Sequence, residues 1–77
     1  MDMEQRLEDA IGHLVALELQ DGDQISGLLV AGTEAANATG ERYAIKTRRP
    51  VAEDWFDYIG ISGPNAVRTL KTLEPDV

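Results

Sequence analysis

The sequence contains no cysteine, a single histidine and only four aromatic residues among its 77 amino acids. Without cysteine the chain cannot form a disulfide, and a zinc site would have no thiolate ligands. No apolar run is longer than four residues, as in Leu28–Ala31, which is far too short to span a bilayer. Because the acidic start, Met1–Glu4, has no apolar segment of a secretory signal, we expect a cytoplasmic protein with no membrane partner.

Basic residues are scarce as well, since 14 acidic side chains against seven basic ones give a net charge of −7. A charge of this sign repels nucleic acid at long range. The imbalance belongs to residues 1–40, which hold eight acids and one base, whereas residues 41–77 hold six of each. Four bases fall within eight residues: Arg42, Lys46, Arg48 and Arg49. We expect any anion-binding surface there, and the alternative is a solvated strand whose charges only aid solubility.

The length allows one domain, residues 1–77, with a small core. A chain this short buries only about 60% of the surface that it exposes when unfolded. Its 43% hydrophobic and 27% charged residues are typical of a globular domain. Association with further copies is therefore the expected source of additional stability.

An amphipathic helix is expected at about residues 3–11. Asp2 and Gln5 have the spacing of a capping box, and Gly12 can adopt the left-handed conformation that ends a helix. Apolar residues recur at the spacing of one helical face: Met3, Leu7, Ala10, Ile11 and Leu14.

The apolar period then changes from helical spacing to simple alternation, which predicts strands. The first two strands are expected at about 14–20 and 24–31, joined by the hairpin signal Asp21-Gly22. Gly27, inside the second strand, indicates a sharp bend or a close approach of two backbones. Residues 33–40 are expected to form a loop, or a loop with a short β-segment. The remaining strands are expected at about 41–48, 55–62 and 66–73.

One helix followed by five short strands predicts a mainly β domain. Because the second strand bends at its middle, the expected architecture is a small, strongly bent, five-stranded barrel with an N-terminal α-helix. Short turns join the strands, and the sequence has no internal repeat.

Side chains suited to catalysis are few. The one histidine, His13, is expected to be structural or solvated. The segment Gly60–Gly63 lacks the glycine spacing of a nucleophile elbow. The acids Glu53, Asp54 and Asp57 do not have the spacing of a calcium-binding loop. We therefore expect no enzyme activity, no metal and no cofactor.

Three aromatic residues lie close to the four bases: Trp55, Phe56 and Tyr58. In so small a protein, aromatic rings are needed in the core or at a contact between subunits. The alternative is a platform on which single-stranded bases stack.

Residues Ile11–Leu29 resemble the first signature of the Sm and Sm-like proteins. That signature is an alternating strand, a short turn with glycine, and a bent strand with the pattern hydrophobic-x-Gly-x-Leu. The residues on its pattern positions are Val15, Leu17, Leu19, Gly22, Ile25, Gly27 and Leu29. The second signature of the family, Ile-Arg-Gly-x-Asn followed by aliphatic residues, looks like Ile61–Val67. The resemblance covers nearly the whole chain and implies an SH3-like or Sm-like barrel capped by the helix.

The resemblance also implies an assembly. Sm-like proteins form rings in which the fourth strand of one subunit pairs with the fifth strand of the next. Here these are the strands expected at 55–62 and 66–73. Such pairing covers strand edges that would otherwise favour aggregation, and a head-to-tail contact of this kind closes a cyclic homo-oligomer.

The RNA pocket of the family can be carried over position by position. Asn37 stands where an asparagine reads the edge of a base. Ala35 replaces a stacking aromatic or histidine, and Ser62 replaces the arginine that closes over the base. The loss of a stacking platform costs about 1–3 kcal/mol per base, so we expect weak uridine binding in a cavity surrounded by these three side chains. The full set of matched positions is Thr33, Ala35, Asn37, Ser62, Gly63 and Asn65.

Two function classes stay open. The first is a ring-forming Sm-like module that binds single-stranded RNA, through the altered pocket or through the basic third strand. The second is a homo-oligomeric structural or protein-interaction scaffold with no nucleic-acid role. RNA binding with a steep salt dependence would distinguish the first from the second.

Overall fold

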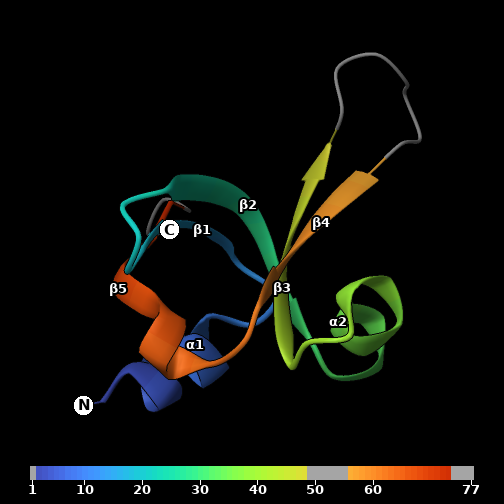
Figure 1. The fold of residues 1–77 in the computed structure, drawn as a ribbon, viewed down its shortest axis with the longest axis horizontal. Coiled ribbons are helices and arrows are strands. Elements are labelled where there is room, and N and C mark those ends of the chain that lie inside the picture. The colour runs from blue at the N-terminus through green and yellow to red at the C-terminus, as the bar shows by residue number, and fades with distance from the viewer. Residues whose placement is uncertain (1, 49–55, 74–77) are drawn as a thin grey trace.

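The structure is a computed structural model that describes residues 2–48 and 56–73. The chain begins with helix α1 (Met3–Ala10) and the strands β1 (Leu14–Leu19) and β2 (Gln24–Ala31). Helix α2 (Gly32–Thr39) and strands β3 (Tyr43–Arg48) and β4 (Phe56–Ile61) follow. A short 3₁₀ helix, η1 (Pro64–Ala66), leads into β5 (Val67–Thr72). The mainly β fold with an N-terminal helix and five strands is thus present (Figure 1).

All five strands form one antiparallel sheet in the order β4-β3-β2-β1-β5. Within the described residues, β4 and β5 lie at opposite edges and do not pair with each other. The sheet is therefore open, and the closure expected of a barrel is not seen in the single chain. Figure 1 shows β5 beside α1, and α2 beside β3 and β4.

The close backbone approach expected at Gly27 is confirmed. Gly27 has φ +153°, a conformation that residues with side chains rarely adopt. A Cβ atom at this position would lie 2.6 Å from the backbone oxygen of Lys46 and 2.8 Å from Cγ2 of Ile45. Only a residue without a side chain lets β2 run this close to β3.

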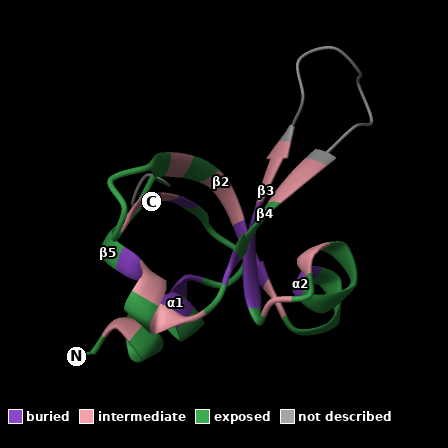
Figure 2. Cartoon of the chain, viewed as in Figure 1, coloured by how far each residue is buried: buried purple, intermediate pink, exposed green. Residues whose placement is uncertain are grey.

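The larger of two apolar clusters lies between α1 and one face of the sheet (Figure 2). Leu7 and Ala10 are the buried residues of α1, as the helical apolar spacing predicts. Glu8 and Asp9, between them, are exposed, as is Arg6 before them. The buried members are Leu7, Ala10, Val15, Leu17, Leu29, Tyr43, Ile45, Ile61, Val67 and Leu70.

The smaller cluster lies on the opposite face, beneath α2. Its buried residues are Val30, Ala35 and Ala44, and the half-buried Leu28 and Tyr58 pack against them. Because strand residues alternate between faces, Val30 and Ala44 point away from the larger cluster. The half of the sheet that contains β2, β3 and β4 is therefore covered on both faces.

The expectation of a loop at residues 33–40 was wrong, because these residues form α2. Gly40, with φ +79°, ends the helix, and its amide donates to the carbonyl of Ala36 at 2.8 Å. Thr39 Oγ1 also donates to the carbonyl of Ala35 at 2.9 Å. The turn signal Thr39-Gly40 was thus a helix end. In the described part of the chain, no helix is long and apolar enough to cross a membrane.

Candidate functional site

The single chain places the three residues carried over from the Sm-like pocket in different surroundings. Ala35 is fully buried against the sheet, with an exposed fraction of 0%, whereas Asn37 is exposed two residues further along α2. Residues two apart on a helix point in different directions. Ser62 is exposed beyond the end of β4. The three described cavities are lined by none of these three residues.

The other matched positions lie elsewhere in the chain. Thr33 is exposed in the first turn of α2 and lines the largest of the three described cavities. Gly63 precedes η1 and Asn65 is exposed within it, and η1 contacts α1. The carry-over assumed a loop between β2 and β3, and the helix that replaces this loop turns Ala35 into the protein.

Two of the four clustered bases, Arg42 and Lys46, are already paired with acids. Arg42 lies 3.5 Å from Glu4 of α1, and its guanidinium stands over the ring of Tyr43 at 5.3 Å. Lys46 lies 3.4 Å from Glu34 of α2 and 5.9 Å from the centre of the Tyr58 ring. Each helix therefore supplies one carboxylate to this stretch. Arg48 is the last residue of β3, and Arg49 lies outside the described residues.

Tyr58 takes part in the smaller apolar cluster. Its hydroxyl donates to the Glu34 carboxylate at 2.8 Å, on the same oxygen that lies near Lys46. This hydrogen bond and the burial of the ring raise the pKa of Tyr58. The ring thus fastens α2 to β4, which supports the structural interpretation for this aromatic residue. The position of Trp55 lies outside the described residues.

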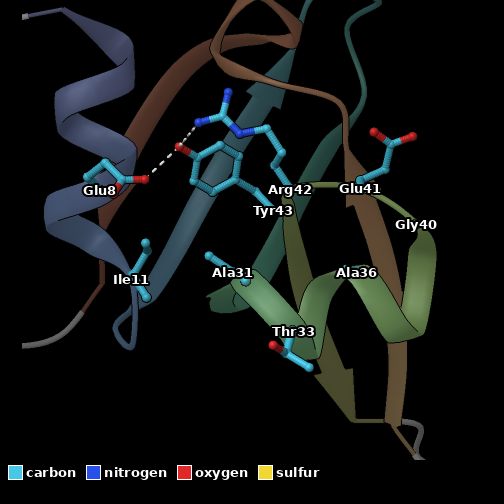
Figure 3. A pocket seen from close by; sticks show the side chains of 10 residues that line it. Glu8, Ile11, Ala31, Thr33, Ala36, Gly40, Glu41, Arg42 and Tyr43 are labelled. Atoms are coloured by element: carbon cyan, nitrogen blue, oxygen red, sulfur yellow. Dashed lines mark hydrogen bonds between the residues drawn. The ribbon is translucent and has the colours of Figure 1, made fainter.

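The largest of the three described cavities, about 630 Å³, is lined by residues of α1, of α2 and of the start of β3 (Figure 3). Figure 3 shows Glu8 and Arg42 both directed at the hydroxyl of Tyr43. This hydroxyl donates to Glu8 at 2.6 Å and accepts from Arg42 at 3.5 Å. Ile11, Ala31 and Ala36 supply apolar wall.

The Glu8 contact decides the chemistry of this cavity. The hydrogen bond to Glu8, together with burial and the charge of Glu8, raises the pKa of Tyr43 above its ordinary value. A tyrosine held protonated in this way is neither a base nor a nucleophile at neutral pH. Among the described residues, no group of three or more histidines or acids is arranged to hold a metal ion. The contacts join α1 to β3, which is a structural role.

The free edges of the sheet are the second candidate site. Hydrogen bonding alternates along an antiparallel pair. The Leu73 amide donates to the carbonyl of Leu14, so Leu14 and Leu73 form a hydrogen-bonded pair. One position on, Val15 faces Thr72, and two further on Leu17 faces Leu70; by the alternation, the residues within each of these two pairs are not hydrogen bonded to each other. The backbone groups of Leu70 and Thr72 therefore point away from β1, toward the outer side of this edge strand.

The two edge strands differ in charge. Strand β5 contains Arg68 and Lys71 and no acid, whereas β4 contains Asp57 and no base. Opposite charges of this kind favour contact between the two edges in different copies over contact between identical edges.

Sequence reasoning missed the contacts of Glu8 and Glu34 with the two tyrosines. The contact of Glu34 was missed because residues Gly32–Thr39 have no helical apolar spacing from which α2 could be inferred. For Glu8 the helical spacing did place it on the polar side of α1, but its partner Tyr43 is 35 residues away. Comparisons with family models, with curated proteins and with solved structures found no match to this chain.

Proposed function

We propose that this chain is a non-enzymatic, ring-forming Sm-like module in which β4 of one copy pairs with β5 of the next. The observation that carries the proposal is the open sheet, whose two edges are these two strands. One edge strand at each end lets every subunit bind one neighbour through β4 and another through β5. A head-to-tail contact of this kind repeats around a ring and leaves no edge uncovered.

The opposite charges of the two edge strands support this direction of pairing. A β5 edge with two bases meets a β4 edge with one acid in a head-to-tail contact. Pairing of two β5 edges would instead bring like charges together. The small core of a 77-residue chain gives a second reason, since association removes further apolar surface from water.

Of the two roles considered for such a ring, we favour the structural or protein-interaction scaffold over RNA binding. Ala35 of α2 is buried against the sheet, and the bases Arg42 and Lys46 are each paired with a helix carboxylate. Bases that already have carboxylate partners must lose them before they contact phosphate. The net charge of −7 opposes the approach of RNA in addition.

Native mass spectrometry and light scattering over a concentration series test the assembly. The expected mass is several times 8.4 kDa. Thr72→Pro is the edge-specific variant, because the Thr72 amide points outward and its loss breaks no bond to β1. We expect Thr72→Pro to remain folded and to lose the assembly, whereas Thr72→Ala keeps it. A folded wild-type monomer at micromolar concentration would contradict the proposal.

A titration of labelled oligouridine at several salt concentrations tests the choice between the two roles. The scaffold role predicts a dissociation constant no better than the non-specific range of roughly 10⁻⁴–10⁻⁶ M. Tighter binding that weakens steeply with salt would favour the RNA-binding role instead.

A further inference from the structure

The edge of β5 is not bare, because a side chain from α1 already occupies part of it. Arg6 directs its guanidinium to the backbone carbonyl of Leu70 at 2.5 Å. The two residues are 64 positions apart in the chain. Leu70 is one of the two residues whose backbone groups point away from β1. Arg6 therefore binds the carbonyl that an added strand would use.

We propose that Arg6 is a gate on the β5 edge: a second copy of this chain can add its β4 strand only after the Arg6 guanidinium leaves the Leu70 carbonyl. This inference rests on the proposed ring and adds a device that controls its formation. In a ladder between strands, the amide of the incoming strand donates to this same carbonyl. Arg6 and that amide compete for one acceptor at the middle of β5.

The surroundings of Arg6 allow its side chain to move aside. A groove of about 260 Å³ lies between α1 and the β5 edge, and it is lined by Arg6, Asp9, Ala10, Leu70 and Thr72. Asp9 stands one helical turn from Arg6 and offers a carboxylate to a displaced guanidinium. Asp9 accepts one bond from Gln5 at 2.9 Å, and a carboxylate has room for further donors. The displaced charge therefore keeps a partner.

The gate also explains how a free copy protects its edge. An unpaired strand edge is a template for uncontrolled pairing, and a charged side chain across it is a common way to blunt it. Here the side chain that crosses the edge, Arg6, comes from a neighbouring helix, in addition to the bases on the strand itself. The edge is thus blocked while the chain is alone and becomes available when a strand of matching charge competes for Leu70.

The test compares Arg6→Ala with Arg68→Ala by native mass spectrometry and sedimentation over the same concentration series. Both variants remove one positive charge near β5, but Arg68 pairs with Glu18 at 3.9 Å, and no bond from it to an edge carbonyl is seen among the described residues. We expect Arg6→Ala to lower the concentration of half-assembly at least about threefold, because a charge-assisted hydrogen bond no longer has to break. Arg68→Ala should not lower it. Arg6→Met, which keeps the aliphatic stem over α1, should act like Arg6→Ala if alanine weakens the fold.

Hydrogen exchange of the Leu70 amide reports on pairing at the β5 edge, and a change in the stability of the fold alone would not protect this amide. This amide points outward, so it should exchange fast in the single chain and slowly in the assembly. Assembly of the wild type with a protected Leu70 amide, and an unchanged midpoint in both Arg6 variants, would overturn the gate and leave the ring intact. Monomers at every concentration for the wild type and for both Arg6 variants would overturn the ring and the gate together. Assembly that leaves Leu70 unprotected would place the contact on another surface and overturn the gate.

Discussion

The two helices attach to the sheet with similar polar contacts but very different apolar support. On α1, Glu8 accepts from Tyr43 and Glu4 pairs with Arg42. On α2, the single residue Glu34 accepts from Tyr58 and pairs with Lys46. Each helix has eight residues. Each thus uses carboxylates to bind a tyrosine and a base of the β3–β4 region.

The apolar surfaces of the two helices are not alike. Helix α1 buries Leu7 and Ala10 in the larger cluster, whereas α2 buries only Ala35 in the smaller one. Buried apolar area contributes more free energy than exposed ion pairs do. We infer that α1 is part of the folding core and that α2 is a weakly held cover on the opposite face. The experiments below test this difference, in order of decreasing effect.

The largest effect is expected at Gly27 in β2. Strands β2 and β3 contribute residues to both apolar clusters, so a disturbance at Gly27 affects the support of both helices. In Gly27→Val, the new Cβ would lie 2.6 Å from the backbone oxygen of Lys46, and no flexible side chain can move to relieve that contact. Overpacking of this kind typically costs about 1–3 kcal/mol, and the positive φ adds to it. We expect no cooperative unfolding transition by circular dichroism.

Gly63→Val is the matched control for Gly27. Gly63 is extended, and a Cβ there would meet no atom within 4 Å. We expect a melting temperature close to that of the wild type. Equal losses in the two variants would mean that valine itself, and not the approach of β2 to β3, is responsible.

Leu7→Ala tests the role of α1 in the core. Leu7 has an exposed fraction of 0%, and its truncation should cost about 2–4 kcal/mol through lost burial and a cavity. Leu14→Ala makes the same chemical change at a side chain that is 47% exposed, and it should have a much smaller effect. Urea unfolding of both variants measures the difference. A small loss for Leu7→Ala would place α1 outside the core and remove the contrast between the helices.

These two helices also show how much of the structure could be predicted from the sequence. The spacing of Met3, Leu7 and Ala10 predicts α1 because its apolar side chains mark one face. Helix α2 consists mostly of small and polar residues, with Gly32, Thr33, Asn37 and Thr39 among its eight positions. Local preference is mixed, because these four residues disfavour a helix whereas the three alanines and Glu34 favour one, and no apolar period marks a buried face. The contacts of Ala35 and Glu34 with strands distant in sequence stabilise it, and no local pattern reveals them.

The strands and the candidate site likewise differ in whether local sequence or distant contacts determine them. Alternating apolar residues and Gly27 predict the strands and the close approach of β2 to β3, because both depend on local geometry. The placement of Ala35, Asn37 and Ser62 around one cavity required that residues 33–40 stay a loop. Since those residues form a helix instead, Ala35 is buried against the sheet while Asn37 is exposed, and neither lines a described cavity. The edge position of Leu70 likewise follows from strand order, which the sequence pattern leaves open.

Tyr43→Phe should make the free energy of unfolding less dependent on pH above pH 10, because it removes the hydroxyl that contacts Glu8 of α1. The contact with Glu8 raises the pKa of Tyr43 in the folded chain above its ordinary value of 10.0. Its contribution is fully present below pH 10 and is lost as pH rises through the folded pKa. The free energy of unfolding of the wild type should therefore fall more steeply above pH 10 than that of Tyr43→Phe. At pH 7, the variant should lose about 1 kcal/mol with the hydrogen bond.

Urea unfolding at several pH values between 7 and 11 measures both quantities. Glu8→Gln serves as a second variant, because it keeps an acceptor for the hydroxyl but removes the charge. Its alkaline loss should lie between those of the wild type and Tyr43→Phe. Parallel curves for the wild type and Tyr43→Phe above pH 10 would show that the Glu8 contact does not link α1 to the stability of the sheet.

Ala35→Gly and Ala36→Gly measure the apolar support of α2 directly. Both changes carry the same loss of helix propensity, about 1 kcal/mol. Ala35 is buried and Ala36 is exposed, so only the first also loses a buried methyl group, worth about 0.8 kcal/mol. Chemical denaturation should resolve this difference. Equal losses would mean that Ala35 does not hold α2 on the sheet.

The smallest effect is expected from Glu34→Gln, which separates the ion pair of α2 from its hydrogen bond. The glutamine oxygen can still accept from Tyr58, whereas the charge attraction to Lys46 is lost. The Lys46 and Glu34 side chains are 25% and 47% exposed, so the pair is partly screened by solvent and should contribute about 0.2–1 kcal/mol. Glu4→Gln breaks the matching pair of α1, where Arg42 and Glu4 are 63% and 56% exposed, and it should cost less. Urea unfolding in low salt and in 1 M salt measures both, and the losses should shrink in high salt because the screening length falls to about 3 Å. If Glu34→Gln costs several times more than this, the polar contact rather than Ala35 holds α2, and the weak cover inferred here is a firmly fixed element of the fold.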